Sequence, residues 1–160
     1  MWTSDGTAEG TLMVKDIYPD SLEWPRDEPP KYLAAMGDRL FFAADDGVHG
    51  HELWTSDGTA EGTVMVKDIH PDGSDSSSPK GLTAVGNRLF FTADDGVHGD
   101  ELWVSDGTEQ GTAMVKDIRP GSADGGLALR LSWASCSSSS PTTECMMLSR
   151  GSPTAQPRAP

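Results

Sequence analysis

One segment of sixteen residues recurs three times along this chain, and this repeat constrains the fold more than any other feature. The copies occupy residues 2–17, 54–69 and 103–118, and the first two differ only in having Leu12 or Val64 at one position. A repeating unit of about fifty residues cannot bury its own apolar surface and does so by stacking on its neighbours. The chain is therefore predicted to fold as an array of stacked units rather than around one central core.

Each complete unit is predicted to contain four short strands. Residues 40–44 are apolar on both faces, as expected for a strand that is covered on both sides. Short turn signals separate the strands, and the pairs Gly37-Asp38 and Gly86-Asn87 are typical of tight hairpins. The predicted strands are residues 32–36, 39–44, 52–56 and 63–69 in one unit, and 82–85, 88–93, 101–105 and 112–118 in the next.

These strands predict an all-β fold of tandem four-stranded antiparallel repeats. Four short strands per unit are typical of a β-propeller blade, and a closed propeller needs about four to eight blades. The chain is predicted to be a partial β-propeller, with a β-solenoid as the alternative, and to end in a disordered C-terminal tail. The predicted segments are a half repeat at 1–18, a linker at 19–30, a full repeat at 31–70, a linker at 71–79, a full repeat at 80–119, and at 120–160 the start of another repeat with the atypical tail.

Two segments carry the sequence ELW-x-SDGT, at residues 52–59 and 101–108. They resemble the ELWxxDGT repeats of large bacterial proteins, which are also described as hyalin-like, and the resemblance extends over residues 1–127. It implies a propeller-like array in a secreted or cell-surface protein, and it supplies no catalytic residues. The structural signature residues are Trp2, Asp5, Gly6, Leu53, Trp54, Asp57, Gly58, Leu102, Trp103, Asp106 and Gly107.

Both ends of the chain depart from the repeat. Met1 stands where the other copies have Leu53 and Leu102, as expected if an internal leucine codon were read as a start. The first residues have no signal-peptide features. In the C-terminal tail, a reading frame shifted by two bases permits codons for a further repeat. We therefore expect a frameshift, a longer parent protein, and a disordered tail in which Cys136 and Cys145 have no selected role.

Charge and composition limit the class of partner. The chain has 25 acidic and 12 basic residues and a net charge of −13, which repels phosphate backbones and argues against nucleic-acid binding. No apolar run approaches the roughly twenty residues of a membrane-spanning helix. An incomplete array leaves strand edges unpaired, so self-association through exposed sheet edges is expected.

The recurring tryptophans and the acidic loops are the candidates for binding chemistry. The tryptophans can stack on sugars, although an aromatic residue at a fixed position of every unit is more often packed between sheets. Four loop aspartates have the oxygen atoms that Ca²⁺ prefers, but the alternating ligands of a calcium loop are absent, and turn formation explains the same residues. These weak calcium candidates are Asp45, Asp46, Asp94 and Asp95.

The favoured function is a non-enzymatic interaction module, a fragment of a larger secreted or cell-surface bacterial protein that binds a protein or glycan ligand. A Ca²⁺-dependent structural array is one alternative, and a fragment of a propeller-scaffold enzyme is another. No catalytic residue and no cofactor are predicted, because near-identical units argue against one unique site with convergent titratable groups.

Overall fold

The computed structural model of the chain describes residues 1–18, 29–118, 120–121, 127–129 and 148–150. These residues form strands and turns and no helix, which confirms the predicted all-β class. None of them belongs to a helix with the length and apolarity needed to cross a membrane. Most of the predicted linker at 19–30 and most of the predicted disordered tail lie outside the described residues.

Two four-stranded sheets form the centre of the molecule. Each is an antiparallel meander in which neighbours in the sequence are neighbours in the sheet. The first comprises β3 (Lys31–Met36), β4 (Arg39–Asp45), β5 (His51–Ser56) and β6 (Val64–Lys67), and the second comprises β7 (Lys80–Val85), β8 (Arg88–Asp94), β9 (Asp100–Ser105) and β10 (Ala113–Lys116). Four antiparallel strands per unit were predicted, and this organisation is confirmed.

The fourth strand of each unit is shorter than predicted. Residues 63–69 were expected to form it, whereas β6 ends at Lys67. The physical reason is that the amide of Ile69 leaves the strand ladder and donates to the carboxylate of Glu52 at 2.9 Å. The hydroxyl of Thr63, at the other end, donates to the carbonyl of Thr59 at 2.6 Å and so belongs to the preceding loop.

Two smaller sheets flank the complete ones. The first pairs β1 (Trp2–Thr3) with β2 (Leu12–Met13), which occupy the third and fourth positions of a unit, as the predicted half repeat requires. The second pairs β11 (Leu127–Leu129) with β12 (Leu148–Arg150). β11 lies where the start of a further repeat was predicted and β12 lies in the predicted disordered tail, most of which is outside the described residues.

The apolar core lies between the sheets. Phe41 on β4 is fully buried in a cluster with Leu89 and Phe91 of the next sheet. The adjacent Phe42 is also fully buried but packs with Ile17, which follows β2. Because successive strand residues point to opposite faces, the two phenylalanines join β4 to the sheets on both sides. This confirms that the apolar strand is covered on both faces.

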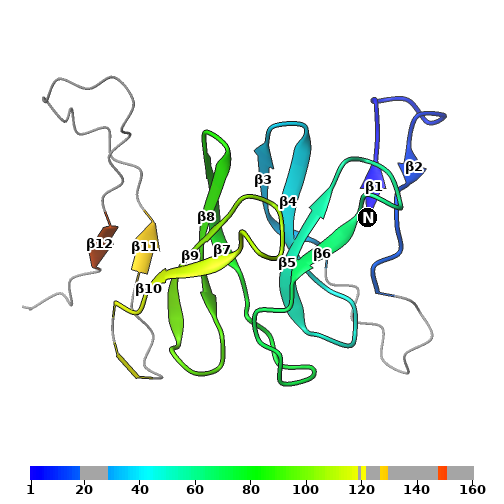
Figure 1. The fold of residues 1–160 in the computed structure, drawn as a ribbon. Coiled ribbons are helices and arrows are strands. Elements are labelled where there is room, and N and C mark those ends of the chain that lie inside the picture. The colour runs from blue at the N-terminus through cyan, green and yellow to red at the C-terminus, as the bar shows by residue number, and fades with distance from the viewer. Residues whose placement is uncertain (19–28, 119, 122–126, 130–147, 151–160) are drawn as a thin grey trace, which may run out of the picture.

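The sheets stand side by side in chain order, from β1–β2 to β11–β12 (Figure 1). The first strands of the two complete sheets, β3 and β7, are in contact. The sheets do not close into a ring within the described residues. The structure therefore shows open, stacked antiparallel sheets.

One position within the first strand, where the register is irregular, differs between the two complete units. Both first strands carry an irregularity in their register with the second strand, and Gly81 adopts a φ of 65° there. The equivalent residue in the first unit is Tyr32, which adopts a φ of 56° and is 50% exposed. This left-handed region disfavours a residue with a Cβ atom, so Tyr32 holds strained backbone at a site where the other unit uses glycine.

Candidate functional site

The SDGT signature forms a hydrogen-bonded loop between the third and fourth strands of each unit. In the first complete unit, Asp57 Oδ1 accepts hydrogen bonds from the amide and the hydroxyl of Thr59, at 2.9 and 2.7 Å. The Thr59 hydroxyl accepts one from the amide of Gly62 at 2.9 Å, and Ser56 and Thr63 join their hydroxyls at 2.7 Å. The same bonds recur around Asp5 and Asp106.

This loop explains why its residues recur. The hydrogen bonds from the hydroxyl and amide of Thr59 lower the pKa of Asp57, so the carboxylate is held as an ionised acceptor. A Cβ atom on Gly62 would lie 2.0 Å from Asp57 Oδ1, so a side chain at this position would displace the aspartate. Gly58 adopts a φ of 89°, which glycine tolerates without steric cost. The signature aspartates and glycines therefore have a structural role in shaping the loop.

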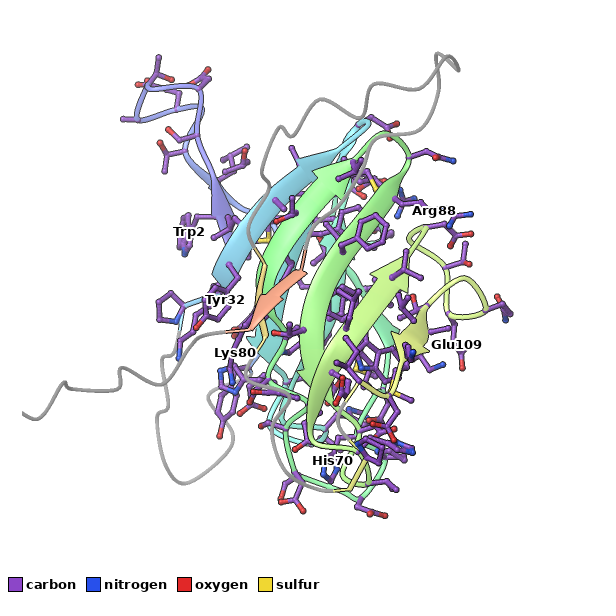
Figure 2. All side chains as sticks on the ribbon, turned by 90° about the vertical axis from the view of Figure 1, so that its left-hand side faces the viewer. Trp2, Tyr32, His70, Lys80, Arg88 and Glu109 are labelled. Carbon is purple, nitrogen blue, oxygen red and sulfur yellow. The ribbon has the colours of Figure 1, made fainter. Side chains whose placement is uncertain are left out.

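The signature tryptophans have different environments. Trp54 and Trp103 are each 6% exposed and pack between sheets, which confirms the prediction of core packing for these two residues. The indole of Trp103 also donates to the carbonyl of Ala93 at 3.1 Å. Trp2 is 65% exposed and projects from the margin of the molecule (Figure 2). The signature leucines Leu53 and Leu102 are buried, as packing between sheets requires.

A lysine of the MVKDI segment links each unit to the following one. Lys15 Nζ donates to the carbonyl of Thr63 in the next unit at 2.7 Å, and Lys67 Nζ donates to the carbonyl of Thr112 at 3.0 Å. Lys67 Nζ also lies 6.0 Å from the centre of the Trp103 ring, within the range of a cation–π interaction. The same junction is thus built twice, and its residues were not singled out by the sequence as a contact between units.

Glu52 and Glu101 are fully buried, and sequence reasoning assigned no role to either. Glu52 Oε2 accepts hydrogen bonds from the amide of Ile69 at 2.9 Å and from the hydroxyl of Ser77 at 2.6 Å, and Oε1 accepts one from the Ser77 amide at 3.0 Å. Burial raises the pKa of Glu52, although these hydrogen bonds oppose the rise. Glu101 accepts from the amide of Ile118 at 3.1 Å. The glutamate therefore fastens the end of its own sheet, and in the first unit it also fastens the connection to the next.

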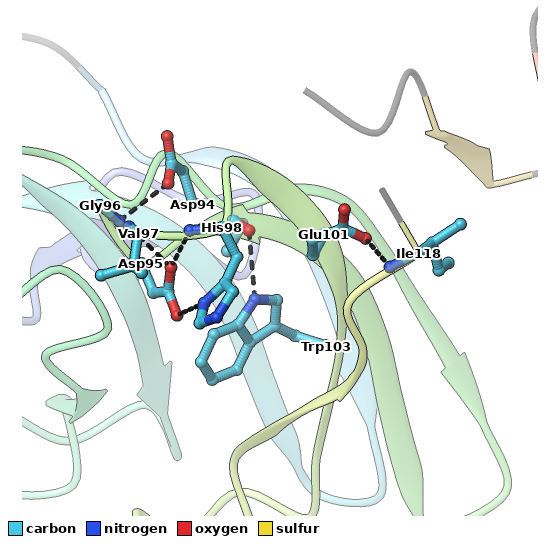
Figure 3. Close-up of polar contacts among 9 residues, drawn as sticks. Asp94, Asp95, Gly96, Val97, His98, Glu101, Trp103 and Ile118 are labelled. Atoms are coloured by element: carbon cyan, nitrogen blue, oxygen red, sulfur yellow. Dashed lines mark hydrogen bonds and ion pairs between the residues drawn. The ribbon is translucent and has the colours of Figure 1, made fainter. Parts of the chain in front are cut away.

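The acidic loops between the second and third strands are closed by their own hydrogen bonds. Asp46 Oδ1 accepts from the amides of Val48 and His49, both at 2.9 Å, and Oδ2 lies 2.8 Å from His49 Nδ1. Asp45 Oδ1 accepts from the amide of Gly47 at 2.7 Å. Figure 3 shows the equivalent contacts in the second unit, where the paired residues are Asp94 with Gly96, and Asp95 with Val97 and His98.

These contacts set the charges in the loops. The hydrogen bond to Asp46 raises the pKa of His49, and the equivalent bond to Asp95 raises that of His98. Partial burial opposes a fall in the pKa of Asp46, but the hydrogen bonds from His49 and Val48 outweigh it and lower the pKa. The carboxylates therefore act as caps for loop amides, the role expected for aspartate in turns.

Each acidic loop presents one apolar side chain to solvent. Val48 is 61% exposed, and Val97 at the same position in the second unit is 65% exposed. The polar groups around them are engaged in the loop, which holds both valines in one backbone conformation. Each complete unit therefore displays one exposed valine at the same position of its acidic loop.

The calcium candidates are not brought together as a metal-binding cluster. Among the described residues there is no group of three or more His, Cys, Asp or Glu side chains that could hold a metal ion. One carboxylate oxygen nevertheless lacks a partner in both units, because Oδ1 of Asp68 and Oδ1 of Asp117 are buried without a hydrogen bond. An unsatisfied buried acceptor costs about 1–3 kcal/mol, so its presence in both units is notable.

A groove of about 630 Å³ lies between the β1–β2 pair and the first complete sheet. Apolar residues dominate its lining, among them Trp2, Leu33, Leu40 and Phe42. In the junction between the two complete sheets, the equivalent space is filled by residues of β3 and β4, including Phe41. The groove is therefore the space that first and second strands occupy in a complete unit.

No protein-family model matches the chain, no curated protein matches it, and no solved structure matches it.

Proposed function

We propose that the chain is a non-enzymatic interaction module that presents its repeated acidic loops to a protein or glycan ligand. The observation that carries the proposal is the exposure of Val48 and Val97 on loops whose polar groups are internally bonded. Single exposed apolar residues are common on protein surfaces. The same exposed residue on the same constrained loop in successive units supports binding to an extended or repetitive ligand, because linked weak contacts reinforce one another.

The parent architecture that we propose is a β-propeller of the ELWxxDGT, hyalin-like type, in a secreted or cell-surface bacterial protein with a role in adhesion. The antiparallel order within each unit and the contact between β3 and β7 support a propeller, whose blades are four-stranded sheets arranged around an axis. The β-solenoid alternative is less well supported, because the β-helical repeats pair strands of successive turns in parallel.

The test of this function is a binding screen of the full chain against glycan arrays and displayed extracellular proteins, followed by loop variants. The double variant Val48→Asp/Val97→Asp replaces both exposed loop valines with charged residues and is expected to weaken ligand binding at least tenfold. Val64→Asp is the matched control, because Val64 is also exposed but lies on β6, away from the loops. Binding that is equally strong in the double variant and the control would contradict a loop-mediated function.

A Ca²⁺-dependent structural array is a second candidate, supported by the unpartnered carboxylate oxygens of Asp68 and Asp117. A cation beside each oxygen would satisfy the buried acceptor. Isothermal titration calorimetry with Ca²⁺ tests this candidate, with the double variant Asp68→Asn/Asp117→Asn as the control. Heat of binding that disappears in the double variant supports it, and no heat at millimolar Ca²⁺ rules it out.

A further inference from the structure

Six Asp-Gly pairs lie among the described residues, and this dipeptide has a covalent chemistry of its own. The glycine amide nitrogen attacks the γ-carbon of the preceding aspartic acid, because glycine has no side chain to obstruct the approach. The N–Cγ bond forms, the acid hydroxyl leaves with the amide hydrogen as water, and a succinimide ring results. Water then opens either C–N bond of the ring and yields aspartate or isoaspartate. The net change is an isomerisation that needs no oxidant or other reactant.

Three of the pairs belong to SDGT loops, where hydrogen bonds hold both reacting groups. The amide of Gly58 donates to Ser56 Oγ at 3.1 Å, and Asp57 Oδ1 accepts from the amide and hydroxyl of Thr59 at 2.9 and 2.7 Å. These bonds lower the pKa of Asp57, and an ionised carboxylate has no hydroxyl that can leave as water. The same bonds hold Asp5-Gly6 and Asp106-Gly107.

Two further pairs belong to the acidic loops and are held in the same way. The amide of Gly47 donates to Asp45 Oδ1 at 2.7 Å, while Asp46 Oδ1 accepts from the amides of Val48 and His49. Equivalent bonds hold Asp95-Gly96 in the second unit. In all five repeat pairs, therefore, the attacking amide and the carboxylate must both lose hydrogen bonds before they can react.

The sixth pair, Asp72-Gly73, lies in the connection between the two complete sheets and is not held. Residues 71–75 are exposed. Within the part of the chain that the structure describes, neither the Asp72 carboxylate nor the Gly73 amide has a hydrogen-bond partner. Gly73 adopts a φ of 72°, and an added Cβ atom there would have no atom within 4 Å. Both reacting groups are therefore free to meet in the folded chain.

We propose that Asp72-Gly73 is a self-modification site of the folded protein, at which Asp72 isomerises to isoaspartate through a succinimide. The chain is fixed on both sides of this turn, because Ile69 and Ser77 both donate hydrogen bonds to Glu52. Isoaspartate adds a methylene group to the main chain and leaves a free α-carboxylate, so the net charge does not change. The modification lengthens the exposed turn between these fixed points and leaves both complete sheets intact.

Incubation of the folded full chain at mildly acidic pH, followed by peptide mapping, tests the proposal. Trypsin releases Asp72 in the peptide 68–80, and electron-transfer fragmentation distinguishes isoaspartate from aspartate. Isoaspartate is expected to form at Asp72 at least about tenfold faster than at any of the five repeat pairs, equivalent to about 1.4 kcal/mol in the activation barrier. Asp124-Gly125 lies outside the described residues and in a different peptide, so it does not enter this comparison.

Two controls separate protection by the fold from the reactivity of the dipeptide. In guanidinium chloride the hydrogen bonds are lost, and all six pairs should react at similar rates. Thr59→Ala removes the hydroxyl that donates to Asp57 and should accelerate isomerisation there, while Asp106 with its unchanged Thr108 serves as the internal control. Equal rates at Asp72 and the repeat pairs in the folded chain would overturn the proposal. An Asp72 that stays unmodified while the unfolded chain is converted would overturn it as well.

Discussion

The first and second copies of the signature segment have nearly the same sequence and very different surroundings. Residues 2–17 and 54–69 differ at one position, yet Trp2 is 65% exposed while Trp54 is 6% exposed. Trp54 lies beside Phe42 on a four-stranded sheet, whereas Trp2 belongs to a sheet of two short strands. The loop hydrogen bonds are the same in both copies. The comparison shows that the signature determines the loop by itself, while burial of its tryptophan depends on the neighbouring strands and sheets.

The largest effect should come from removing the tryptophan in each of the two settings. Trp54→Ala is expected to destabilise the chain by about 3–5 kcal/mol, because it empties a packed site between sheets. Trp2→Ala should change the free energy of unfolding of the monomeric chain by less than about 0.5 kcal/mol. Chemical denaturation at concentrations below association measures both values. Equal losses would show that the two tryptophans are buried alike, and the comparison would fail.

The second-largest loss of stability should come from replacing the buried Glu52. Glu52→Ala leaves two amides and a hydroxyl without their acceptor and is expected to cost about 3 kcal/mol. Glu61→Ala is the control, because Glu61 is exposed in the same unit and should be nearly neutral. Denaturation midpoints of the two variants give the difference. A neutral Glu52→Ala variant would mean that the connection after β6 is held by other contacts.

Two loop glycines offer a smaller test of the same comparison. Gly58 and Gly107 adopt φ values of 89° and 93°, so alanine strains both by about 1–2 kcal/mol. A Cβ atom on Gly107 would also lie 3.1 Å from Phe41 Cζ of the preceding sheet, whereas none lies within 4 Å at Gly58. Gly107→Ala should therefore cost about 1 kcal/mol more than Gly58→Ala. Identical unfolding midpoints for the two variants would show that crowding against Phe41 does not affect stability.

Tyr32 offers a stabilising change. Its φ of 56° matches the 65° of Gly81 in the other unit, so Tyr32→Gly should relieve strain and stabilise the chain by up to about 1 kcal/mol. Leu33→Gly is the control, since Leu33 is exposed next to it but does not adopt a positive φ, and glycine there should destabilise the strand. Thermal unfolding of both variants measures the effect. A loss of stability in Tyr32→Gly would assign Tyr32 a contact that outweighs the strain.

The sequence predicted the local features better than the relations between units. The strands, the hairpins at Gly37 and Gly86 and the SDGT loop follow from residue type and spacing, because short-range hydrogen bonds and backbone preferences determine them. The role of Glu52 was missed, since its partner Ser77 lies 25 residues away in the chain. The one sequence feature that could have indicated a buried acceptor is the recurrence of a glutamate directly before the apolar Leu-Trp pair in both complete units.

The contacts between units were also beyond the sequence. Lys67 lies at the end of β6, and the carbonyl of Thr112 to which it donates belongs to another unit. The sequence feature that came closest to indicating this contact is the recurrence of the same lysine in every MVKDI segment. A recurring surface lysine is also explained by solubility, so the recurrence did not identify the contact. The acidic loops gave the opposite result, because Asp45 and Asp46 can be interpreted as turn formers or as ligands, and the structure shows the turn-forming bonds.

The smallest effect concerns pH and should be the same in both complete units, because it arises within one loop. The pKa values of His49 and His98 are raised from 6.5, so their contribution to stability is fully present below about pH 6.5 and is lost as pH rises through the raised values. The pKa values of Asp46 and Asp95 are lowered from 3.8, so their contribution is present above that pH and is lost on acidification through the lowered values. Both loops should therefore be most stable between about pH 4 and pH 6.5.

Titration of the histidine ring protons by NMR checks this expectation in each unit separately. His49 and His98 should both titrate above the ordinary histidine value, and Asp46→Asn should return His49 alone toward 6.5, since Asp46 is its hydrogen-bond partner. His98 serves as the internal control in that variant, because its partner Asp95 is unchanged. If Asp46→Asn shifted both histidines equally, the two loops would be coupled through the sheets. The division between features that belong to one unit and features that depend on a neighbour would then not hold at this site.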